Sequence, residues 1–275
     1  FAGTPVSRVV GLCHSVQNTT RELAELVGVP YDEVSYLGAG VNHQAWILQF
    51  EREGQDLYPL LDTAIAGDPE LRRRVRVEIY RRFGRFPTES SEHSAEYLPF
   101  FLRDDAMIEQ FRVPVDEYVR RSEENLEQYA EMRRMLAAGE PFEIERSLEY
   151  ASLIIHSQLT GQERTIYGNV RNDGLITNLP DGACVEVPCL VDGDGLRPVA
   201  VGALPPQLAA LNRTFLNVCE LTVRAALEGS REHVYHAALL DPNAAGTLSP
   251  QAIVEMVDEL IEAHGAALPA GIAPG

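Results

Sequence analysis

A turn-rich stretch of β-branched residues, 165–204, constrains the fold more than any other part of this 275-residue chain. Glycine and proline turns divide it into short apolar runs, and the sequence Asp-Gly-Asp-Gly at 192–195 is typical of a β-hairpin. Segments with helical spacing precede and follow it. The sequence therefore predicts an α+β fold that is rich in helices and contains one mixed or antiparallel sheet.

The beginning of the chain indicates strand, helix and further strands. Residues 6–12 have the continuous apolar character of a buried strand. A helix is expected over residues 19–27, because Thr19 and Glu22 fit a capping box. Two strands should follow on either side of a glycine-rich bend at residues 38–40.

Seven further segments show helical spacing with start or stop signals. They are residues 68–84, a segment that begins near Ser91, and residues 113–139, 146–161, 205–229, 230–241 and 249–265. We expect 113–139 to be the longest helix. No internal repeat, low-complexity linker or block of like charge divides the chain, so residues 1–275 are treated as one domain.

Charge and composition exclude several classes of function. The chain has 23 Lys and Arg against 41 Asp and Glu, a formal charge of -18, which disfavours binding to nucleic acids or anionic membranes. No apolar run reaches the roughly 18 residues of a membrane-spanning helix, and the first residues lack the features of a signal peptide. Four cysteines are too few for a disulfide framework. We therefore expect a cytoplasmic protein.

Two side chains are candidate metal ligands. Cys13 is expected between a strand and a helix, where the helix dipole and free backbone N–H groups favour a thiolate. His43 follows the glycine bend, which can bring a side chain into a cleft. Taken singly, each is more often structural, but a thiolate and an imidazole together form a reasonable metal-binding pair. The pair is incomplete, because water or substrate oxygens would have to fill the remaining positions.

Tyr97 is a candidate general base. It stands four residues after His93, on the same face of the expected helix. The alternative is an ordinary core aromatic. A tyrosine acts as a base only if its pKa of about 10 is lowered, and a neighbouring divalent cation can lower it. Tyr97 is therefore expected to converge with Cys13 and His43.

Four segments of the sequence together resemble glycoside hydrolase family four, most of all its α-galactosidase branch, to which the α-galacturonidases are close. They are residues 11–17, 40–46, 89–101 and 168–195. The similarity keeps their order and spacing and runs from about Val9 to Leu268. Family members carry an NAD⁺-binding Rossmann domain ahead of the cysteine motif. The resemblance implies that this chain is the C-terminal substrate- and metal-binding domain, related in fold to the corresponding half of lactate and malate dehydrogenases, with residues 1–12 ending the missing nucleotide domain.

The resemblance also implies a mechanism. NAD⁺ takes a hydride from carbon three of the sugar, and a divalent metal, usually Mn²⁺, polarises the resulting ketone. A base then removes the proton on carbon two, the aglycone leaves by elimination, water adds, and the hydride returns. By motif position, Cys13 and His43 are the metal ligands and Tyr97 is the base.

His14 and several polar residues bear on the substrate. His14 stands where phosphoglycosidase relatives have an aspartate that assists departure of the aglycone, and it could donate a proton or hydrogen-bond the substrate. This difference, and the lack of an obvious basic cluster near Tyr97, favour a non-phosphorylated glycoside. Arg120 and Arg121 weaken that argument. The candidate sugar contacts, with capping or solvent-exposed roles as the alternative, are Asn42, His93 and Asn172.

Two other functions stay open. One is an NAD-dependent sugar or hydroxy-acid dehydrogenase, since the hydride step is shared. The other is a non-catalytic fragment that binds metal or mediates oligomerisation. Members of the family are commonly dimers or tetramers, so a homodimer or homotetramer is expected, and the apolar helix at residues 212–229 is either interface or core.

Overall fold

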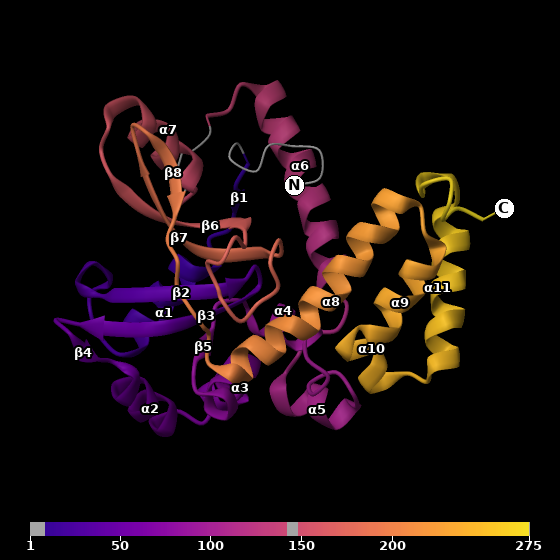
Figure 1. The fold of residues 1–275 in the computed structure, drawn as a ribbon, viewed down its shortest axis with the longest axis horizontal. Helices are drawn as coiled ribbons and strands as arrows, with labels where there is room; N and C mark the ends of the chain where they lie inside the picture. The colour runs from indigo at the N-terminus through magenta and orange to yellow at the C-terminus, as the bar shows by residue number, and fades with distance from the viewer. Residues whose placement is uncertain (1–8, 142–147, 275) are drawn as a thin grey trace.

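An antiparallel sheet of eight strands forms one side of the molecule (Figure 1). The computed structural model describes residues 9–141 and 148–274. The main strand order is β1-β6-β7-β2-β3-β4, with β5 paired to β3 and β8 paired to β7. The strands are β1 (Gly11–Leu12), β2 (Ser35–Val41), β3 (Gln44–Arg52), β4 (Gln55–Asp56), β5 (Phe86–Pro87), β6 (Arg164–Arg171), β7 (Cys184–Asp192) and β8 (Gly195–Pro198).

Ten of the described helices overlap the segments expected from the sequence or fill gaps between them. They are α1 (Ser15–Leu26), α2 (Tyr58–Gly67), α3 (Val75–Phe83), α4 (Ser91–Glu96), α5 (Asp105–Phe111), α6 (Glu117–Ala138), α7 (Tyr150–Thr160), α8 (Pro206–Glu228), α9 (Arg231–Leu240) and α11 (Pro250–His264). Shorter helical turns are α10 (Pro242–Thr247), Tyr31–Glu33, Leu71–Arg73 and Gly265–Ala267. The α+β prediction is confirmed.

Some element predictions were wrong in detail. The expected helix 68–84 is interrupted at Arg74, whose extended backbone separates Leu71–Arg73 from α3. Helices α2 and α5 were not predicted. The longest of the described helices is α8 with 23 residues, one more than α6. Much of the expected strand 6–12 lies outside the described residues, and its visible part is β1.

The first helix begins four residues earlier than the capping box predicted. Thr19 is buried inside α1, and its Oγ1 donates a hydrogen bond to the carbonyl oxygen of Thr88 at 2.7 Å. His14 occupies the N-cap position instead. Cys13 therefore lies immediately before the first turn of α1, closer to the helix N-terminus than the sequence indicated.

The β2–β3 hairpin turns at Asn42 and His43 and not at the glycines. His43 adopts a φ of 64°, in the left-handed region that few non-glycine residues occupy. Gly40 serves a different purpose, because a Cβ there would lie 2.7 Å from backbone atoms of β3. The glycine permits close approach of the two strands, and the turn places His43 at the tip of the hairpin.

Helix α8 lies between the sheet and the C-terminal helices α9 and α11 (Figure 1). Its Asn212 accepts a hydrogen bond from the indole N–H of Trp46 at 3.2 Å and donates one to the carbonyl of Gln44 at 2.7 Å. These bonds fasten α8 to β3. No described helix has both the length and the apolar character needed to cross a membrane.

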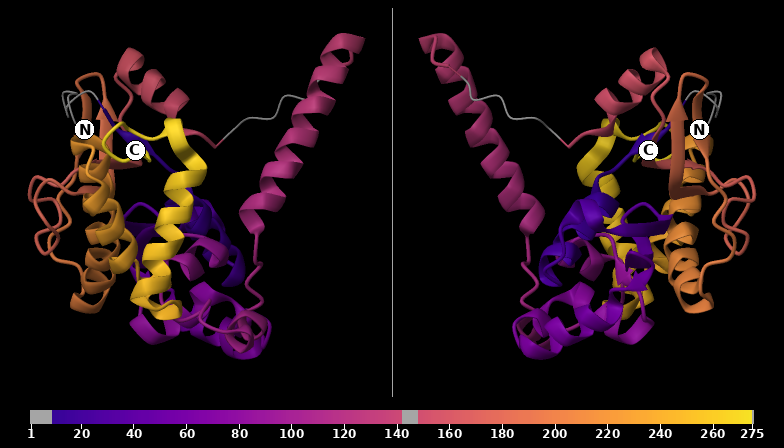
Figure 2. Two further views of the ribbon diagram at one scale, coloured as in Figure 1. Left: turned by 90° about the vertical axis from the view of Figure 1, so that its right-hand side faces the viewer. Right: turned by 90° about the vertical axis from the view of Figure 1, so that its left-hand side faces the viewer.

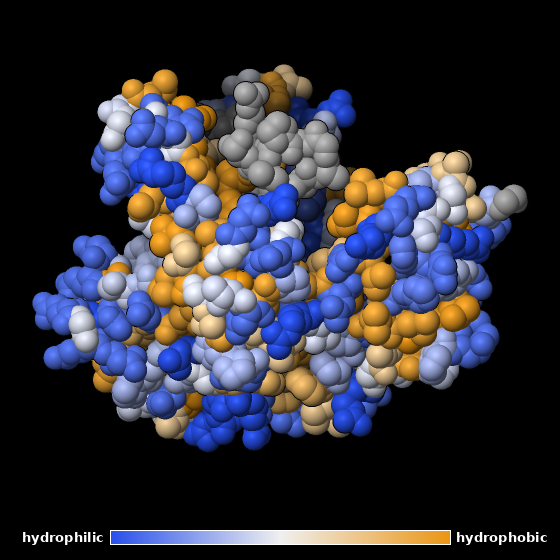
Figure 3. Space-filling model, in the orientation of Figure 1, coloured by the Kyte–Doolittle hydropathy of each residue, from blue (hydrophilic) through white to orange (hydrophobic). Residues whose placement is uncertain are grey.

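Two helices leave apolar side chains uncovered. Helix α6 has no buried residue and leans away from the rest of the molecule (Figure 2). Within residues 212–229, Leu216 and Ala225 are buried while Val223 and Leu227 are exposed, and apolar surface is visible over the second half of α8 (Figure 3). This segment is therefore partly core, and the expected homo-oligomer stays a prediction.

Candidate metal and catalytic centre

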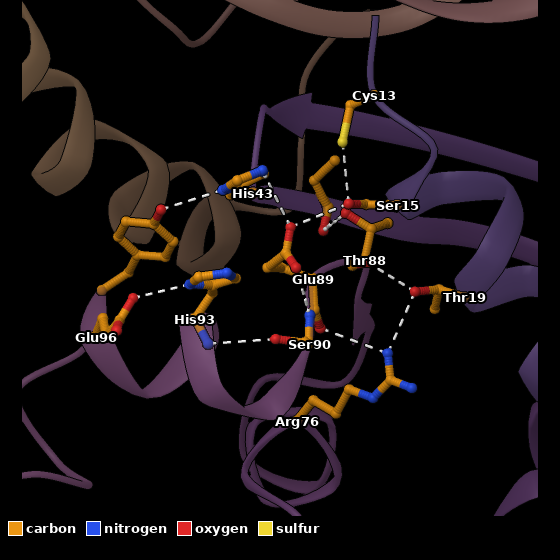
Figure 4. A network of polar contacts seen from close by, with 12 residues as sticks. Cys13, Ser15, Thr19, His43, Arg76, Thr88, Glu89, Ser90, His93 and Glu96 are labelled. Atoms are coloured by element: carbon orange, nitrogen blue, oxygen red, sulfur yellow. Dashed lines mark hydrogen bonds and ion pairs between the residues drawn. The ribbon is translucent and has the colours of Figure 1, made fainter. Parts of the chain in front are cut away.

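Three side chains from separate parts of the chain converge on one point: Cys13, His43 and Glu89 (Figure 4). A ligand atom of each lies within 4.8 Å of the other two. Cys13 precedes α1, His43 stands at the tip of the β2–β3 hairpin, and Glu89 follows β5. The sequence indicated the cysteine and the histidine, whereas Glu89 was missed.

The Glu89 carboxylate is buried and held from both sides. Its Oε2 accepts a hydrogen bond from Ser15 Oγ at 3.0 Å and lies 3.3 Å from His43 Nε2. Its Oε1 accepts a hydrogen bond from the backbone N–H of Ser90 at 2.8 Å. Ser15 Oγ also lies 3.1 Å from Cys13 Sγ, so this hydroxyl links the thiol to the carboxylate.

Cys13 is poised to ionise. Burial alone would raise the pKa of this thiol, but hydrogen bonds from His43, Ser15 and Asn42 outweigh it and lower the pKa to about 6. The hydrogen bond with Cys13 in turn raises the pKa of His43, more than burial lowers it. The sulfur is therefore a thiolate at neutral pH, which is the form that binds metals.

Tyr97 contacts the same histidine from the opposite side of its ring. The phenol oxygen lies 3.2 Å from His43 Nδ1, and the phenol ring packs edge-on against Phe215, with a centroid separation of 4.6 Å. Burial raises the pKa of Tyr97 to about 12, with the charges of Glu89 and Glu96 adding to the increase. The phenol is therefore close enough to act with His43, but it becomes a base only if positive charge offsets these carboxylates.

His93 completes one wall of a hollow of about 320 Å³ beside the cluster. Its ring stacks on His43 with a centroid separation of 5.6 Å, and its Nδ1 lies 2.9 Å from Glu96. Side chains with charge or ring nitrogens that line the hollow are His43, Glu89, Glu92, His93, Glu117 and Arg121. The hollow gives a small polar molecule access to His43 and Glu89.

His14 and Asn42 border the cluster without sharing its geometry. The Nε2 atom of His14 lies 2.7 Å from Glu149 Oε1, near the start of α7. Within the described residues no hydrogen bond or ion pair joins it to His43 or Tyr97. Asn42 lies close enough to Cys13 to contribute to the lowered pKa of its thiol.

The prediction that Asn172 contacts a sugar is not supported by its position. The residue is fully buried, its amide nitrogen donates to the carbonyls of Ile176, Leu179 and Pro180, and its oxygen accepts from the N–H of Ile176. A side chain whose hydrogen bonds are all internal holds the loop after β6 in place. It leaves no group for a ligand.

Glu186 is a further buried carboxylate beneath the cluster. It lies in β7, opposite Gly40 of β2 and Asn169 of β6, is fully buried, and neither oxygen has a hydrogen-bond partner among the described residues. Burial raises the pKa of Glu186 to about 8, and the charge of Cys13 adds to the increase. Asn169 Oδ1 and Gln44 Oε1 are likewise unpaired in the described part of the chain.

This environment fits a divalent cation. Sulfur, imidazole nitrogen and carboxylate oxygen are the donors that proteins offer to metals such as Mn²⁺, Fe²⁺ and Zn²⁺. The buried acceptor oxygens of Gln44, Asn169 and Glu186 have no hydrogen-bond donor among the described residues, and ionising a buried carboxyl group that has no partner is costly. A cation held by Cys13 and His43 would offset that cost.

The raised pKa of Glu186 predicts a pH-dependent effect of Glu186→Gln on stability. The folded-state pKa lies above the unfolded value, so the carboxyl's unfavourable contribution grows as pH rises from about 4 to 8 and is complete above that range. Without added metal, the variant should be more stable than the parent by on the order of 5 kcal/mol above pH 8, and nearly equal to it below pH 5. Urea denaturation at both pH values measures the difference.

Glu262→Gln, an exposed change on α11, is the matched control and should have little effect at either pH. A gain for Glu186→Gln that is equal at both pH values, or absent at both, would contradict the assignment.

Comparison with known proteins identifies relatives of this chain. Residues 38–244 match the family 4 glycosyl hydrolase C-terminal domain. The chain is 42% identical to an α-galactosidase of Bacillus subtilis (strain 168) over 95% of its own length and 62% of that protein's. Among solved structures, it shares a fold with lplD of Bacillus subtilis, with a TM-score of 0.80, 22% identity, and 91% of this chain and 62% of that one covered.

A 6-phospho-α-glucosidase from gut microorganisms, solved in complex with NAD and Mn²⁺, has the same fold, with a TM-score of 0.74, 21% identity, and 96% of this chain and 62% of that one covered. The chain thus spans about 62% of the length of these proteins. Because the family match covers well over half of its residues, the chain belongs to the family 4 glycosyl hydrolases.

Proposed function

We propose that the protein is a glycoside hydrolase of the α-galactosidase type that acts on a non-phosphorylated sugar and uses NAD⁺ and a divalent cation. One observation carries the proposal: the Tyr97 hydroxyl lies at Nδ1 of His43 and the Glu89 carboxylate at Nε2. The Cys13 sulfur lies in the same cluster, beside an open hollow. The 42% identity to the α-galactosidase of Bacillus subtilis supports the same conclusion. In this proposal the chain provides the domain that binds the substrate and the cation.

The bound groups supply chemistry that side chains lack. NAD⁺ accepts and returns a hydride, and a divalent cation such as Mn²⁺ acts as a Lewis acid on a sugar oxygen. Cys13 and His43 would hold the cation. The structural relative that was solved with NAD and Mn²⁺ supports this pairing of cofactors.

The chain's own residues would position the sugar and move protons. Tyr97 would remove the proton from carbon two and later return one, since its hydroxyl is half-buried and adjoins His43. His93 and Asn42 would contact sugar hydroxyls. His14 is the proposed proton donor to the departing aglycone, with Glu149 orienting its ring. Hydrogen bonding to the substrate is its alternative role.

The charges around the hollow favour a neutral sugar. Carboxylates of Glu89, Glu92 and Glu117 line it, and the one guanidinium among the lining residues belongs to Arg121, 3.8 Å from Glu117. Arg120 forms ion pairs with Glu117 and Glu124. A phosphate or a sugar carboxylate would meet a surplus of negative charge here.

Hydrolysis of 4-nitrophenyl α-galactoside by the full-length protein, which includes a nucleotide-binding domain, tests the proposal; this chain alone should be inactive. Turnover should require NAD⁺, Mn²⁺ and a thiol reductant together, the reductant because a thiolate with a pKa of about 6 oxidises readily. The 6-phosphate of this substrate and the α-galacturonide should show a kcat/KM about 100-fold lower, because like charges cost a few kcal/mol. Release of 4-nitrophenol is the readout.

Two results would contradict this function. Full turnover after removal of both metal and nucleotide would exclude the redox mechanism. Net accumulation of NADH without 4-nitrophenol would identify a dehydrogenase instead.

A further inference from the structure

We propose that Glu89 is a third protein ligand of the cation, so that the protein binds the cation without sugar or nucleotide. The inference rests on the proposed function, because it concerns the same centre. Its basis is the convergence of three potential ligand atoms within 4.8 Å of one another, one from each of Cys13, His43 and Glu89. Three such donors leave further coordination positions for water or substrate oxygens.

The position of Glu89 relative to the His43 ring shows whether this carboxylate could bind the cation itself or could only hydrogen-bond a histidine that binds it. In metal-bound histidines, the ring nitrogen that faces away from the metal commonly donates its N–H to a carboxylate. Here Nδ1 faces Tyr97, whereas Glu89 lies 3.3 Å from Nε2, the nitrogen that points toward Cys13 (Figure 4). The carboxylate therefore shares the metal-facing side of the ring with the thiolate.

The backbone around Glu89 is fixed before any cation binds. The Thr88 carbonyl accepts a hydrogen bond from Thr19 in α1, and the Glu89 carbonyl accepts one from Arg76 in α3 at 3.4 Å. Ser90 caps α4 and donates its N–H to Glu89 Oε1. A buried carboxylate anchored by two helices and a cap loses little entropy on coordination, which favours affinity.

The environment of Glu186 independently favours a cation beside Cys13, His43 and Glu89. The Glu186 carboxylate is fully buried and unpaired within the described residues, and its charge interacts with those of Cys13, His43 and Glu89. Of the nearby cations, Arg76 is already paired with Glu22. One carboxylate and one thiolate thus face a single imidazole, with a further unpaired carboxyl group buried nearby, and a divalent cation would balance them.

Cation binding to the metal-free protein, without NAD⁺ or sugar, tests the inference. Mn²⁺ affinity is measured by calorimetry, and Co²⁺ absorption reports the ligand set. Glu89→Gln keeps the shape but loses the charge, so it should weaken Mn²⁺ binding at least 10- to 100-fold, about the loss seen for outer partners of metal ligands, and should change the Co²⁺ spectrum. Glu92→Gln, in the same hollow, is the matched control and should change affinity less than about threefold.

Two further variants make each outcome decisive. Glu89→Asp keeps the charge on a shorter side chain and should also weaken binding, which matters if the glutamine variant does not fold. Unchanged affinity and an unchanged Co²⁺ spectrum in the Glu89 variants overturn the inference. If Cys13→Ser loses binding in that case, the centre of the proposed function stands and Glu89 alone is excluded. If Cys13→Ser also binds normally, the centre itself is misassigned.

Discussion

Changing Cys13 to serine should abolish hydrolysis of an α-galactoside while leaving the fold intact. A thiol with a pKa of about 6 is ionised at neutral pH, whereas a serine hydroxyl is not, so the variant loses an anionic ligand. Loss of a metal ligand should cost more than the 10- to 100-fold that is typical when a residue hydrogen-bonded to a ligand is lost. We therefore expect kcat/KM to fall at least about 1000-fold. Steady-state hydrolysis of 4-nitrophenyl α-galactoside by the full-length protein with NAD⁺ and Mn²⁺ measures this fall.

Stability should change little, because the Cys13 side chain is only partly buried and serine nearly matches its volume. Cys184→Ser is the control: it makes the same chemical change at an exposed position at the start of β7. The control should retain parental activity. Activity of Cys13→Ser within tenfold of the parent would remove the thiolate from the proposed centre.

The fold was largely predictable because its signals are local. β-Branched residues and turn sequences predicted a sheet-forming stretch where β6, β7 and β8 lie, and the Asp-Gly-Asp-Gly turn joins β7 to β8 as expected. The hairpin turn at Asn42 and His43 was not predicted, since glycines are the usual sign of a turn. There His43 is held in a left-handed conformation by the strands on either side. Strain of this kind depends on tertiary structure and leaves no local signal.

The candidate site was predictable only in part. Cys13, His43 and Tyr97 came from motifs that resemble a family, and the structure brings all three together. In the sequence, Glu89 is only a polar residue that precedes a helix cap. Its place in the cluster depends on contacts with α1 and α3, which the sequence does not show. Glu186 did leave a signal, because a carboxylate within an apolar strand is seldom fully buried without a partner.

Asn172 is a candidate whose position in the structure is that of a loop support. It was a candidate sugar contact because it lies in one of the family-like segments, yet its amide bonds the backbone of its own loop. A buried asparagine that satisfies a loop and one that binds a ligand look alike in sequence. Only the burial and the hydrogen bonds distinguish them.

Replacing Tyr97 with phenylalanine should stop proton exchange at carbon two of the sugar. Phenylalanine keeps the edge-on contact with Phe215 and removes only the hydroxyl, whose described hydrogen bond is to His43. Loss of a positioned general base costs about 10²- to 10⁴-fold in rate, so exchange of the carbon-two proton with solvent deuterium should fall by that factor. Nuclear magnetic resonance of the recovered sugar measures it.

Cation affinity separates this role from a structural one. Tyr97→Phe should bind Mn²⁺ as the parent does, because the phenol lies on the ring nitrogen of His43 that faces away from Cys13. Tyr235→Phe on α9 loses a hydroxyl that bonds Asp258 far from the hollow, and it should leave exchange unchanged. Burial and the charges of Glu89 and Glu96 raise the pKa of Tyr97 to about 12. Because a bound cation would lower this pKa, proton exchange should depend on the cation. Exchange at the parental rate in Tyr97→Phe would exclude this phenol as the base.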